Sequence, residues 1–352
     1  MTPAPTPRPG LRDVSPYVSP QLSVKARLNT NESPYPLPEG FAEELADEVA
    51  ALPLHRYPDG QMIRLREELS VSVGHPVEGT WAANGSNEIL TQLLQAYGGA
   101  GRRAAVFEPT YLLHSRIAWL TQTDVVSLTL DEGFSLSQDN VSAAVDAGPD
   151  VVFVCSPNNP TGNAQPVDAV SSLAGRTRAL VIVDEAYIEF GGSTCLPLVR
   201  EHPNVVVTRT MSKAFALAGA RIGYALASAD VIEDLQRVRL PYHVSAITQA
   251  AGVVALRHQK EALAILDAIR DERDRILASL RAMSDVVVYP SDANFVLFVP
   301  PKPAIAVWRH LLDQGVLIRD LSTVVPNALR VTAGSSDEVD LFLSALREAL
   351  LA

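Results

Sequence analysis

Five short apolar segments constrain the fold of this chain more than any other feature of its sequence. They cover residues 104–107, 125–130, 151–155, 180–184 and 205–209, and each begins with a run of consecutive apolar residues. Segments with a helical spacing of apolar residues lie between several of them. Continuous apolar strands separated by helices are typical of parallel sheets that are covered on both faces. The sequence therefore predicts an α/β fold with a large, mainly parallel sheet flanked by helices.

The pattern changes after Tyr224. A long helical stretch is expected over residues 245–283, followed by strands near 286–289, 294–299 and 329–333 and by helices near 304–314 and from 336 onward. This order predicts a second, smaller α+β domain. With the proline-rich start of the chain, it suggests an N-terminal arm over 1–36, a large domain over 37–240 and a small domain over 241–352. The arm is expected to be irregular, and 352 residues suffice for two domains.

Several classes of function are disfavoured by composition. The formal net charge of −11 and the lack of a Lys- or Arg-rich run argue against nucleic-acid binding. No apolar run approaches the roughly 20 residues that span a bilayer, so no membrane partner is expected. The two cysteines are too few for a disulfide framework and no signal-peptide pattern is present, which predicts a cytoplasmic protein. The histidines and cysteines lack metal-ligand spacing, so no metal site is predicted.

A single lysine, Lys213, follows the last of the five apolar segments. Two hydroxyl residues, Thr210 and Ser212, precede it, and Arg221 follows it. Open α/β sheets bind ligands at the carboxyl ends of their strands. A lysine can form a Schiff base with an aldehyde cofactor, and hydroxyls with an arginine can hold a phosphate. This grouping suits pyridoxal-phosphate chemistry, although a lone lysine would more often lie on the surface.

Upstream, Asp184 ends another apolar segment. A buried carboxylate there could keep the nitrogen of a pyridine ring protonated. Tyr187, three residues later, could reach the phenolic oxygen of the same ring, as could Asn159. The alternatives are that Asp184 caps a helix and that Tyr187 is a core aromatic residue.

Two further segments could contact the cofactor. The turn Asn84-Gly-Ser-Asn-Glu88 opens a helical pattern, and backbone N–H groups at a helix N-terminus bind anions, so it suits a phosphate. Tyr111 follows a strand and is placed to stack on a cofactor ring. Ser86 could equally be a helix cap, and Tyr111 could be a packed loop residue.

Two arginines, Arg319 and Arg330, interrupt apolar, strand-like stretches near the C-terminus. A buried arginine needs an anionic partner, and its planar guanidinium binds carboxylates and phosphates with two parallel hydrogen bonds. Each could instead pair with a structural Asp or Glu.

Together these motifs resemble the fold-type I pyridoxal-phosphate aminotransferases and, within them, the histidinol-phosphate aminotransferases. The resemblance runs from Leu11 to about Leu346. The segments that carry it are Arg27-Leu-Asn-Thr-Asn-Glu-Ser-Pro-Tyr-Pro36 and residues 55–59, 83–88, 155–162, 183–187, 209–219 and 329–332.

The resemblance implies roles around the cofactor ring. Lys213 would form the Schiff base with pyridoxal 5'-phosphate and move the substrate α-proton. Asp184 would pair with the pyridine nitrogen, Asn159 and Tyr187 with the phenolic oxygen, and Tyr111 would stack on the ring.

It also implies which residues hold the anions. Tyr57 would reach the phosphate in the neighbouring subunit, which implies a homodimer with a shared active site. The substrate would face Asn159, Tyr17, Arg319 and Arg330. The cofactor phosphate would be held by Ser86, Asn87, Thr210, Ser212 and Arg221.

The implied reaction is a reversible two-stage transamination in L-histidine biosynthesis. L-histidinol phosphate and 2-oxoglutarate would give imidazole acetol phosphate and L-glutamate. An aromatic amino-acid aminotransferase on the same scaffold is the first alternative, and a pyridoxal-phosphate-dependent decarboxylase of a phosphorylated amino acid is the second.

Overall fold

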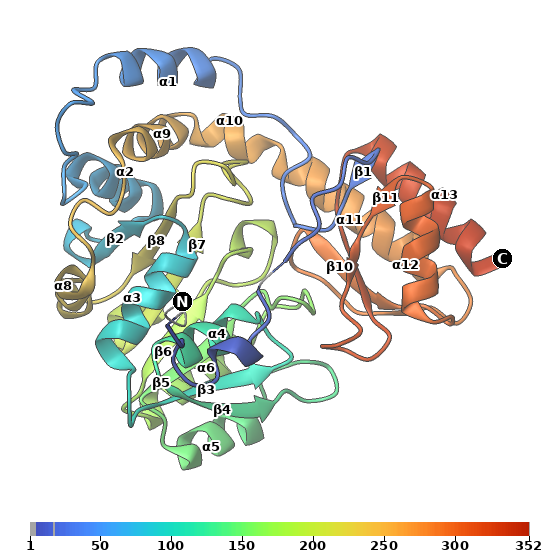
Figure 1. Cartoon of the computed structure of the whole chain (residues 1–352), viewed down its shortest axis with the longest axis horizontal. Coiled ribbons are helices and arrows are strands. Elements are labelled where there is room, and N and C mark those ends of the chain that lie inside the picture. The colour runs from blue at the N-terminus through green and yellow to red at the C-terminus, as the bar shows by residue number, and fades with distance from the viewer. Residues whose placement is uncertain (1–4, 17, 352) are drawn as a thin grey trace.

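A computed structural model describes residues 5–16 and 18–351 and shows an α/β architecture built on one large sheet and one smaller sheet (Figure 1). The large sheet has seven strands in the order β2-β8-β7-β6-β5-β3-β4. Strand β8 runs antiparallel to both of its neighbours, β2 and β7, whereas the pairs from β7 to β4 are all parallel. The bounds are β2 Thr80–Ala83, β3 Arg103–Glu108, β4 Asp124–Thr129, β5 Val151–Cys155, β6 Leu180–Asp184, β7 Val205–Thr210 and β8 Gly223–Leu226.

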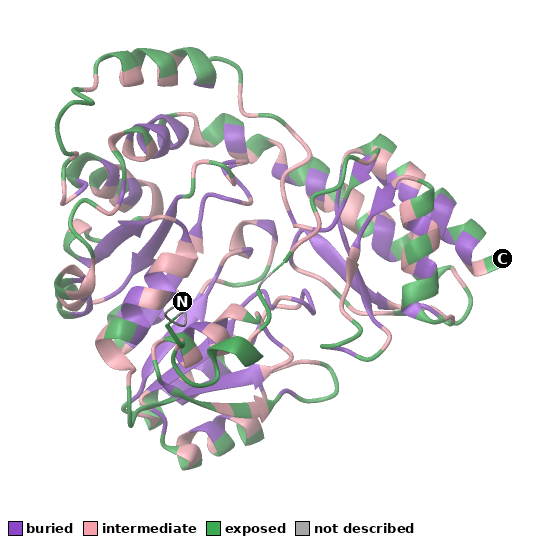
Figure 2. Ribbon diagram, viewed as in Figure 1, coloured by how far each residue is buried: buried purple, intermediate pink, exposed green. Residues whose placement is uncertain are grey.

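Burial explains why the central strands are apolar throughout. All five residues of β5 and all five of β6 are buried, so both faces of the sheet are covered there, as Figure 2 shows. Edge strand β4 instead has four exposed residues, which fits its mixed sequence. The helices of this part are α1 Phe41–Ala50, α2 Ile63–Val73, α3 Ser86–Tyr97, α4 Leu113–Leu120, α5 Gln138–Ala147, α6 Val167–Arg176, α7 Leu198–Glu201 and α8 Ala229–Val238. The mainly parallel sheet flanked by helices is confirmed.

The smaller sheet has four antiparallel strands in the order β12-β13-β10-β9. Helices α11 (Leu266–Arg281), α12 and α13 belong to the same part of the chain and contact one another or this sheet. The bounds are β9 Val287–Val288, β10 Phe295–Val299, α12 Ala304–Asp313, β11 Val316–Leu317, β12 Arg319–Asp320, β13 Leu329–Thr332 and α13 Ser336–Leu351.

The N-terminal segment is more ordered than the sequence suggests. It contains a short 3₁₀ helix at Leu11–Asp13 and strand β1 (Ala26–Arg27), which pairs in parallel with β11. The end of the expected arm therefore packs with the C-terminal part of the chain. The three-way division at residues 36 and 240 stays a prediction.

Two other expectations differ from the structure. The long helix expected over 245–283 is divided into α9 (Ala246–Arg257), α10 (Gln259–Ala264) and α11 (Leu266–Arg281). The interruptions fall at His258 and Ile265, so neither glycine nor proline marks them. Strands β2 and β8 were not expected, because each has only four residues and gains its burial from long-range pairing.

Parallel strands bring their carboxyl ends to one edge of the large sheet. In the register of the sheet, Cys155 lies beside Asp184, and Asp184 lies beside Thr208, two residues before the end of β7. The chain segments that follow β5, β6 and β7 therefore emerge next to one another, and they carry the residues of the candidate site.

Candidate active site

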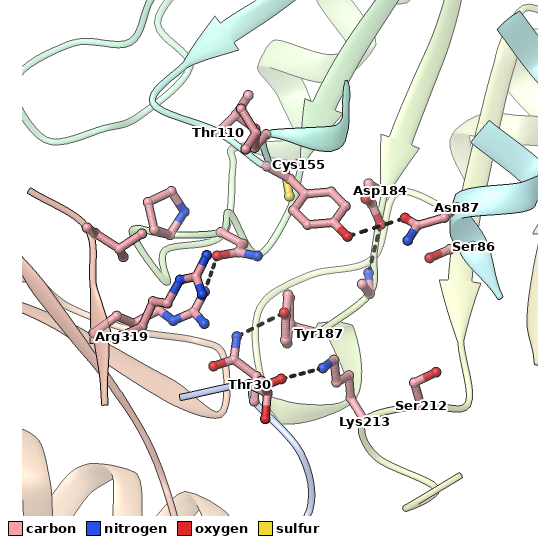
Figure 3. A pocket seen from close by; sticks show the side chains of 18 of the residues that line it. Thr30, Ser86, Asn87, Thr110, Cys155, Asp184, Tyr187, Ser212, Lys213 and Arg319 are labelled. Carbon is pink, nitrogen blue, oxygen red and sulfur yellow. Dashed lines mark hydrogen bonds between the residues drawn. The ribbon is translucent and has the colours of Figure 1, made fainter. Parts of the chain in front are cut away.

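A cavity of about 290 Å³ lies at this edge of the large sheet (Figure 3). Its wall includes segments from the large sheet, the N-terminal segment at Asn29–Asn31 and the smaller sheet at β12 and β13. Twelve residues proposed from the sequence line it, namely Ser86, Asn87, Tyr111, Asn159, Asp184, Tyr187, Thr210, Ser212, Lys213, Arg221, Arg319 and Arg330. The structure thus brings together side chains that lie far apart along the chain.

Lys213 is the only lysine among the described residues that line this cavity. Its Nζ donates a hydrogen bond to the backbone oxygen of Thr30 at 2.8 Å. The pKa of Lys213 is lowered from 10.5 to about 8: burial is the main cause, the positive charges of Arg330 and Arg221 add to it, and the negative charge of Glu32 opposes it. A substantial fraction of the amine is therefore neutral, and nucleophilic, near neutral to mildly alkaline pH.

Asp184 ends β6 with both carboxylate oxygens engaged. Its Oδ2 lies 3.0 Å from Nε2 of His114, and its Oδ1 accepts a hydrogen bond from the backbone N–H of Ala186 at 3.2 Å. The element that follows is a 3₁₀ turn, Ile188–Phe190, whose cap position is Tyr187. Asp184 is therefore not a helix cap, and its carboxylate is held toward the cavity at the end of its strand.

His114 is a site residue that the sequence did not reveal. Its side chain is fully buried on α4, stacks on Phe153 with ring centroids 4.7 Å apart, and meets the ring of Tyr111 edge-on at 5.4 Å. Its Nδ1 has no hydrogen-bond partner among the described residues. The proton of a neutral ring is then best placed on Nε2, which donates to Asp184. The only sequence signal was its position three residues after Tyr111.

A group of donors suited to a phosphate surrounds the start of α3. Gly85 precedes Ser86, the first helical residue, so Ser86 is not the cap and the backbone N–H groups of the first turn are oriented toward the site. Arg221 donates to the hydroxyl of Ser212 at 3.3 Å, and Thr210 donates to the same hydroxyl at 3.0 Å. One guanidinium, several hydroxyls and a helix N-terminus thus converge.

Two glycines make this convergence possible. A Cβ on Gly223 would collide with the backbone nitrogen of Ser86, and a Cβ on Gly85 would lie 2.6 Å from Nη2 of Arg221. Gly85 also has φ +82°, a conformation that L side chains rarely adopt. The close approach of β8 to the start of α3 therefore requires glycine at position 223, and the backbone conformation favours glycine at position 85.

Tyr187 also lines the cavity. Its hydroxyl accepts a hydrogen bond from Nδ2 of Asn31 at 2.9 Å, and burial raises its pKa to about 12. The phenol therefore stays protonated at neutral pH and can donate a hydrogen bond. Tyr111 donates to Oδ1 of Asn87 at 3.3 Å, which fixes the tilt of its ring.

The two predicted arginines come from the smaller sheet. Arg330 is buried, donates to the backbone oxygen of Asn29 at 3.0 Å and to Oδ1 of Asn159, and lies over the ring of Phe295. Arg319 donates to the hydroxyl of Ser19 at 3.3 Å. Both side chains thus lie where the smaller sheet and the N-terminal segment close one wall of the cavity.

The remaining two candidates are Tyr57 and Tyr17. Tyr57 is 80% exposed, stacks on Tyr242 and is not among the residues that line this cavity in its own chain. Tyr17 lies outside the described residues. Among the described residues, no three or more His, Cys, Asp or Glu side chains are grouped so that they could hold a metal ion. The helices of residues 5–16 and 18–351 include none that is both long and apolar enough to cross a membrane.

Comparison with known proteins decides the family. Residues 23–346 match the model of the family described as aminotransferase class I and II. The chain belongs to this family. It is 49% identical to a histidinol-phosphate aminotransferase of Thermobifida fusca, covering 98% of this chain and 94% of the relative. It is 47% identical to a histidinol-phosphate aminotransferase of Frankia casuarinae, covering 97% and 90%.

A solved structure shows the same fold. The crystal structure of histidinol-phosphate aminotransferase from Sinorhizobium meliloti, in complex with pyridoxal-5'-phosphate, superposes with a TM-score of 0.85 at 26% identity and covers 94% of this chain and 92% of that chain. The resemblance and the fold expected from the sequence are confirmed.

Proposed function

We propose that this protein is a pyridoxal-phosphate-dependent aminotransferase that converts L-histidinol phosphate and 2-oxoglutarate reversibly to imidazole acetol phosphate and L-glutamate in histidine biosynthesis. The observation that carries this proposal is 49% identity to a histidinol-phosphate aminotransferase over nearly the whole of both chains. The arrangement of Lys213, Asp184 and the two wall arginines supports it. A cytoplasmic location stays a prediction.

The residues of the cavity fit the cofactor. When bound, pyridoxal phosphate supplies an aldehyde that bonds to amines and a ring that withdraws electrons from the substrate α-carbon. Lys213 is the amine for the aldehyde, and Asp184 is the carboxylate for the ring nitrogen. Tyr111 would stack on the ring, with Asn159 and Tyr187 at its phenolic oxygen. The phosphate would be held by Ser86, Asn87, Thr210, Ser212 and Arg221.

The proton chemistry follows from the surroundings of two residues. The Asp184 carboxylate, bonded to His114, would hold a proton on the ring nitrogen, because an ionised carboxylate stabilises that positive charge. Lys213 would move the proton between the substrate α-carbon and the former aldehyde carbon of the cofactor, which lie on either side of the amino nitrogen. Its pKa of about 8 suits this exchange, because a base works best when its pKa is close to the working pH.

The arginines account for the two substrates. Glutamate carries two carboxylates, whereas histidinol phosphate carries a phosphate monoester and no carboxylate. Planar guanidinium groups bind both anions in the same geometry. Arg330 and Arg319, at one wall of the cavity, would hold these anions in turn, with Asn159 and Tyr17 beside the substrate.

We also propose a homodimer in which Tyr57 completes the site of the partner subunit. Two segments, residues 54–63 and 240–247, carry exposed apolar side chains. Helix α1, which precedes the first segment, lies at the outer edge of the molecule with many exposed residues (Figure 2). Large exposed apolar patches mark interaction surfaces, and a second copy is the partner in this proposal. The exposed apolar side chains of the two segments are Leu54 (60% exposed), Tyr57 (80%), Ile63 (52%), Leu240 (75%), Tyr242 (46%) and Ile247 (46%), and the rings of Tyr57 and Tyr242 are in contact.

Mixing variants tests the shared site. In one mixture, Tyr57→Phe chains with an intact Lys213 exchange subunits with Lys213→Ala chains, so the one competent site receives the unaltered Tyr57 of its partner. In a second mixture, both substitutions are in one chain and neither is in the other, so the competent site receives the substituted residue. Weaker cofactor retention in the second mixture alone supports the proposal. Weaker retention in the first mixture, or a monomer in sedimentation, contradicts it.

The substrate is tested by a half-reaction. Purified holoenzyme is mixed with histidinol phosphate, phenylalanine or phosphothreonine, and the loss of the cofactor's yellow absorbance is followed. We expect histidinol phosphate to react with the largest second-order rate constant. Faster reaction with phenylalanine would identify an aromatic aminotransferase, and release of carbon dioxide from phosphothreonine would identify a decarboxylase.

A further inference from the structure

Tyr57, the residue proposed to enter the partner's site, does not stand alone on the surface. Its ring lies face to face with that of Tyr242, with centroids 4.5 Å apart and planes inclined by 8°. Tyr57 is 80% exposed, so few other contacts limit its rotamers. An exposed tyrosine that must dock into a site loses side-chain entropy when it docks, and a stacked neighbour reduces that loss in advance.

The backbone conformation at Tyr242 is unusual for a bulky residue. Its φ is +53°, in the left-handed region that a bulky residue adopts only when its surroundings determine it. The backbone of Gly60 passes against the same ring, where an added Cβ would lie 3.5 Å from it. Gln249, on α9, donates to the backbone oxygen of Asp59 at 2.9 Å. The segment that carries Tyr57 is therefore packed against Tyr242 and hydrogen-bonded to the start of α9, which follows the loop of Tyr242.

The loop of Tyr242 is anchored in turn on the phosphate-binding region of its own chain. The backbone oxygen of His243 accepts a hydrogen bond from Nδ2 of Asn84 at 2.5 Å, and the His243 ring stacks on Trp81 at 5.5 Å. Its Nε2 lies 3.1 Å from the backbone oxygen of Ala82 in β2. Asn84 is the first residue of the turn that carries Ser86. The loop thus rests on a rigid strand end rather than on solvent-exposed chain.

We infer that Tyr242 is a positioning residue for the cofactor site of the partner subunit: it holds the ring of Tyr57 in the orientation in which Tyr57 enters that site. This inference rests on the proposed shared dimer and deepens it. Tyr242 acts through Tyr57, and its effect is on how well the partner's site retains the cofactor.

The experiment uses Tyr242→Leu, which removes the stacked ring, and Tyr242→Phe, which keeps it. In mixed dimers, one chain carries Lys213→Ala, so the Schiff-base absorbance reports cofactor binding at the single remaining Lys213. Placing Tyr242→Leu in the Lys213→Ala chain should raise the dissociation constant of pyridoxal phosphate at the intact site roughly two- to tenfold, as expected from the strength of an aromatic pair. Placing it in the other chain, with the intact Lys213, should leave the dissociation constant unchanged, and Tyr242→Phe should behave as the unmutated residue.

A double-mutant cycle separates positioning from a general structural effect. If Tyr242 acts through Tyr57, then Tyr242→Leu should add nothing to the loss caused by Tyr57→Leu in the same chain. A loss that follows the chain carrying the intact Lys213, additive losses, or an equal loss in Tyr242→Phe would overturn the inference.

The dimer is checked independently by sedimentation and by Tyr57→Leu alone. A monomer, or a Tyr57→Leu effect confined to its own chain, would overturn the shared site and this inference with it. A Tyr57→Leu effect across the interface without a Tyr242→Leu effect would overturn this inference alone.

Discussion

Nε2 of His114 lies 3.0 Å from Oδ2 of Asp184, and this contact joins helix α4 to the end of strand β6 inside the core. Both side chains are almost completely buried. The imidazole is itself fixed between Phe153 and Tyr111, so the carboxylate is held in one orientation toward the cavity. We conclude that the orientation of Asp184 depends on a second residue that does not itself line the cavity.

Replacing His114 tests this contact. We expect His114→Leu to lower the rate of the half-reaction about ten- to a hundredfold, the range expected when a charged group loses a hydrogen bond. His114→Gln, whose amide can donate from nearly the same place, should retain most of the rate. Stopped-flow absorbance measures both variants, with thermal unfolding as the control for stability. Equal losses in the two variants would show that ring packing, rather than the hydrogen bond, matters at this position.

Lys213→Ala should fold but lose covalent capture of the cofactor. The substitution removes the amine and leaves the surrounding hydroxyls and Arg221 in place, so pyridoxal phosphate should still bind without forming a Schiff base. Absorbance spectroscopy distinguishes the two bound forms, and circular dichroism checks the fold. An unchanged Schiff-base absorbance in this variant would show that another amine carries the cofactor.

The pH dependence of cofactor capture follows from the pKa of Lys213. Because that pKa is lowered to about 8, the capture rate of the apoenzyme should rise as pH increases and level off above about 8, rather than near 10.5. Arg330 contributes to the lowered value, so Arg330→Gln should move the midpoint to higher pH. The rate is measured by mixing apoenzyme with pyridoxal phosphate over a pH series. A midpoint that does not move would mean that burial alone lowers the pKa.

Glu189 should make the stability of the protein depend on pH. Burial raises its pKa to about 7, against the opposing charge of Arg209, and its buried Oε2 accepts no hydrogen bond from the described residues. The folded state then holds this proton more tightly than the unfolded state. The contribution is complete below pH 4.5 and is lost as pH rises through about 7.

Replacing Glu189 with Gln removes the titrating carboxyl group. We expect Glu189→Gln to remove on the order of 1 to 3 kcal/mol of the change in unfolding free energy between about pH 4.5 and 8. Denaturant unfolding at both pH values measures this difference, and Glu233→Gln on the exposed face of α8 serves as the control. An unchanged difference in Glu189→Gln would show that the carboxyl is hydrated and ordinary.

Much of the architecture could be predicted because it depends on local pattern. The continuous apolar sequence of β5 and β6 predicted their burial on both faces. Strands β2 and β8 were not predicted, because four residues are too few to show a clear pattern of apolar residues. The division of residues 245–283 into three helices escaped it because the breaks involve ordinary residues at His258 and Ile265.

The sequence by itself determined which chemical groups this protein can use: the amine of Lys213, the carboxylate of Asp184 and the guanidinium groups of Arg319 and Arg330. Only the tertiary structure decided the pKa values and the orientations of these groups. The bond from Lys213 to Thr30 spans 183 positions, and that from His114 to Asp184 spans 70. Such contacts leave no periodic trace in the sequence, because they arise when whole elements pack. Residue type is encoded locally, whereas the burial and neighbours that set pKa values and orientation come from the packed chain.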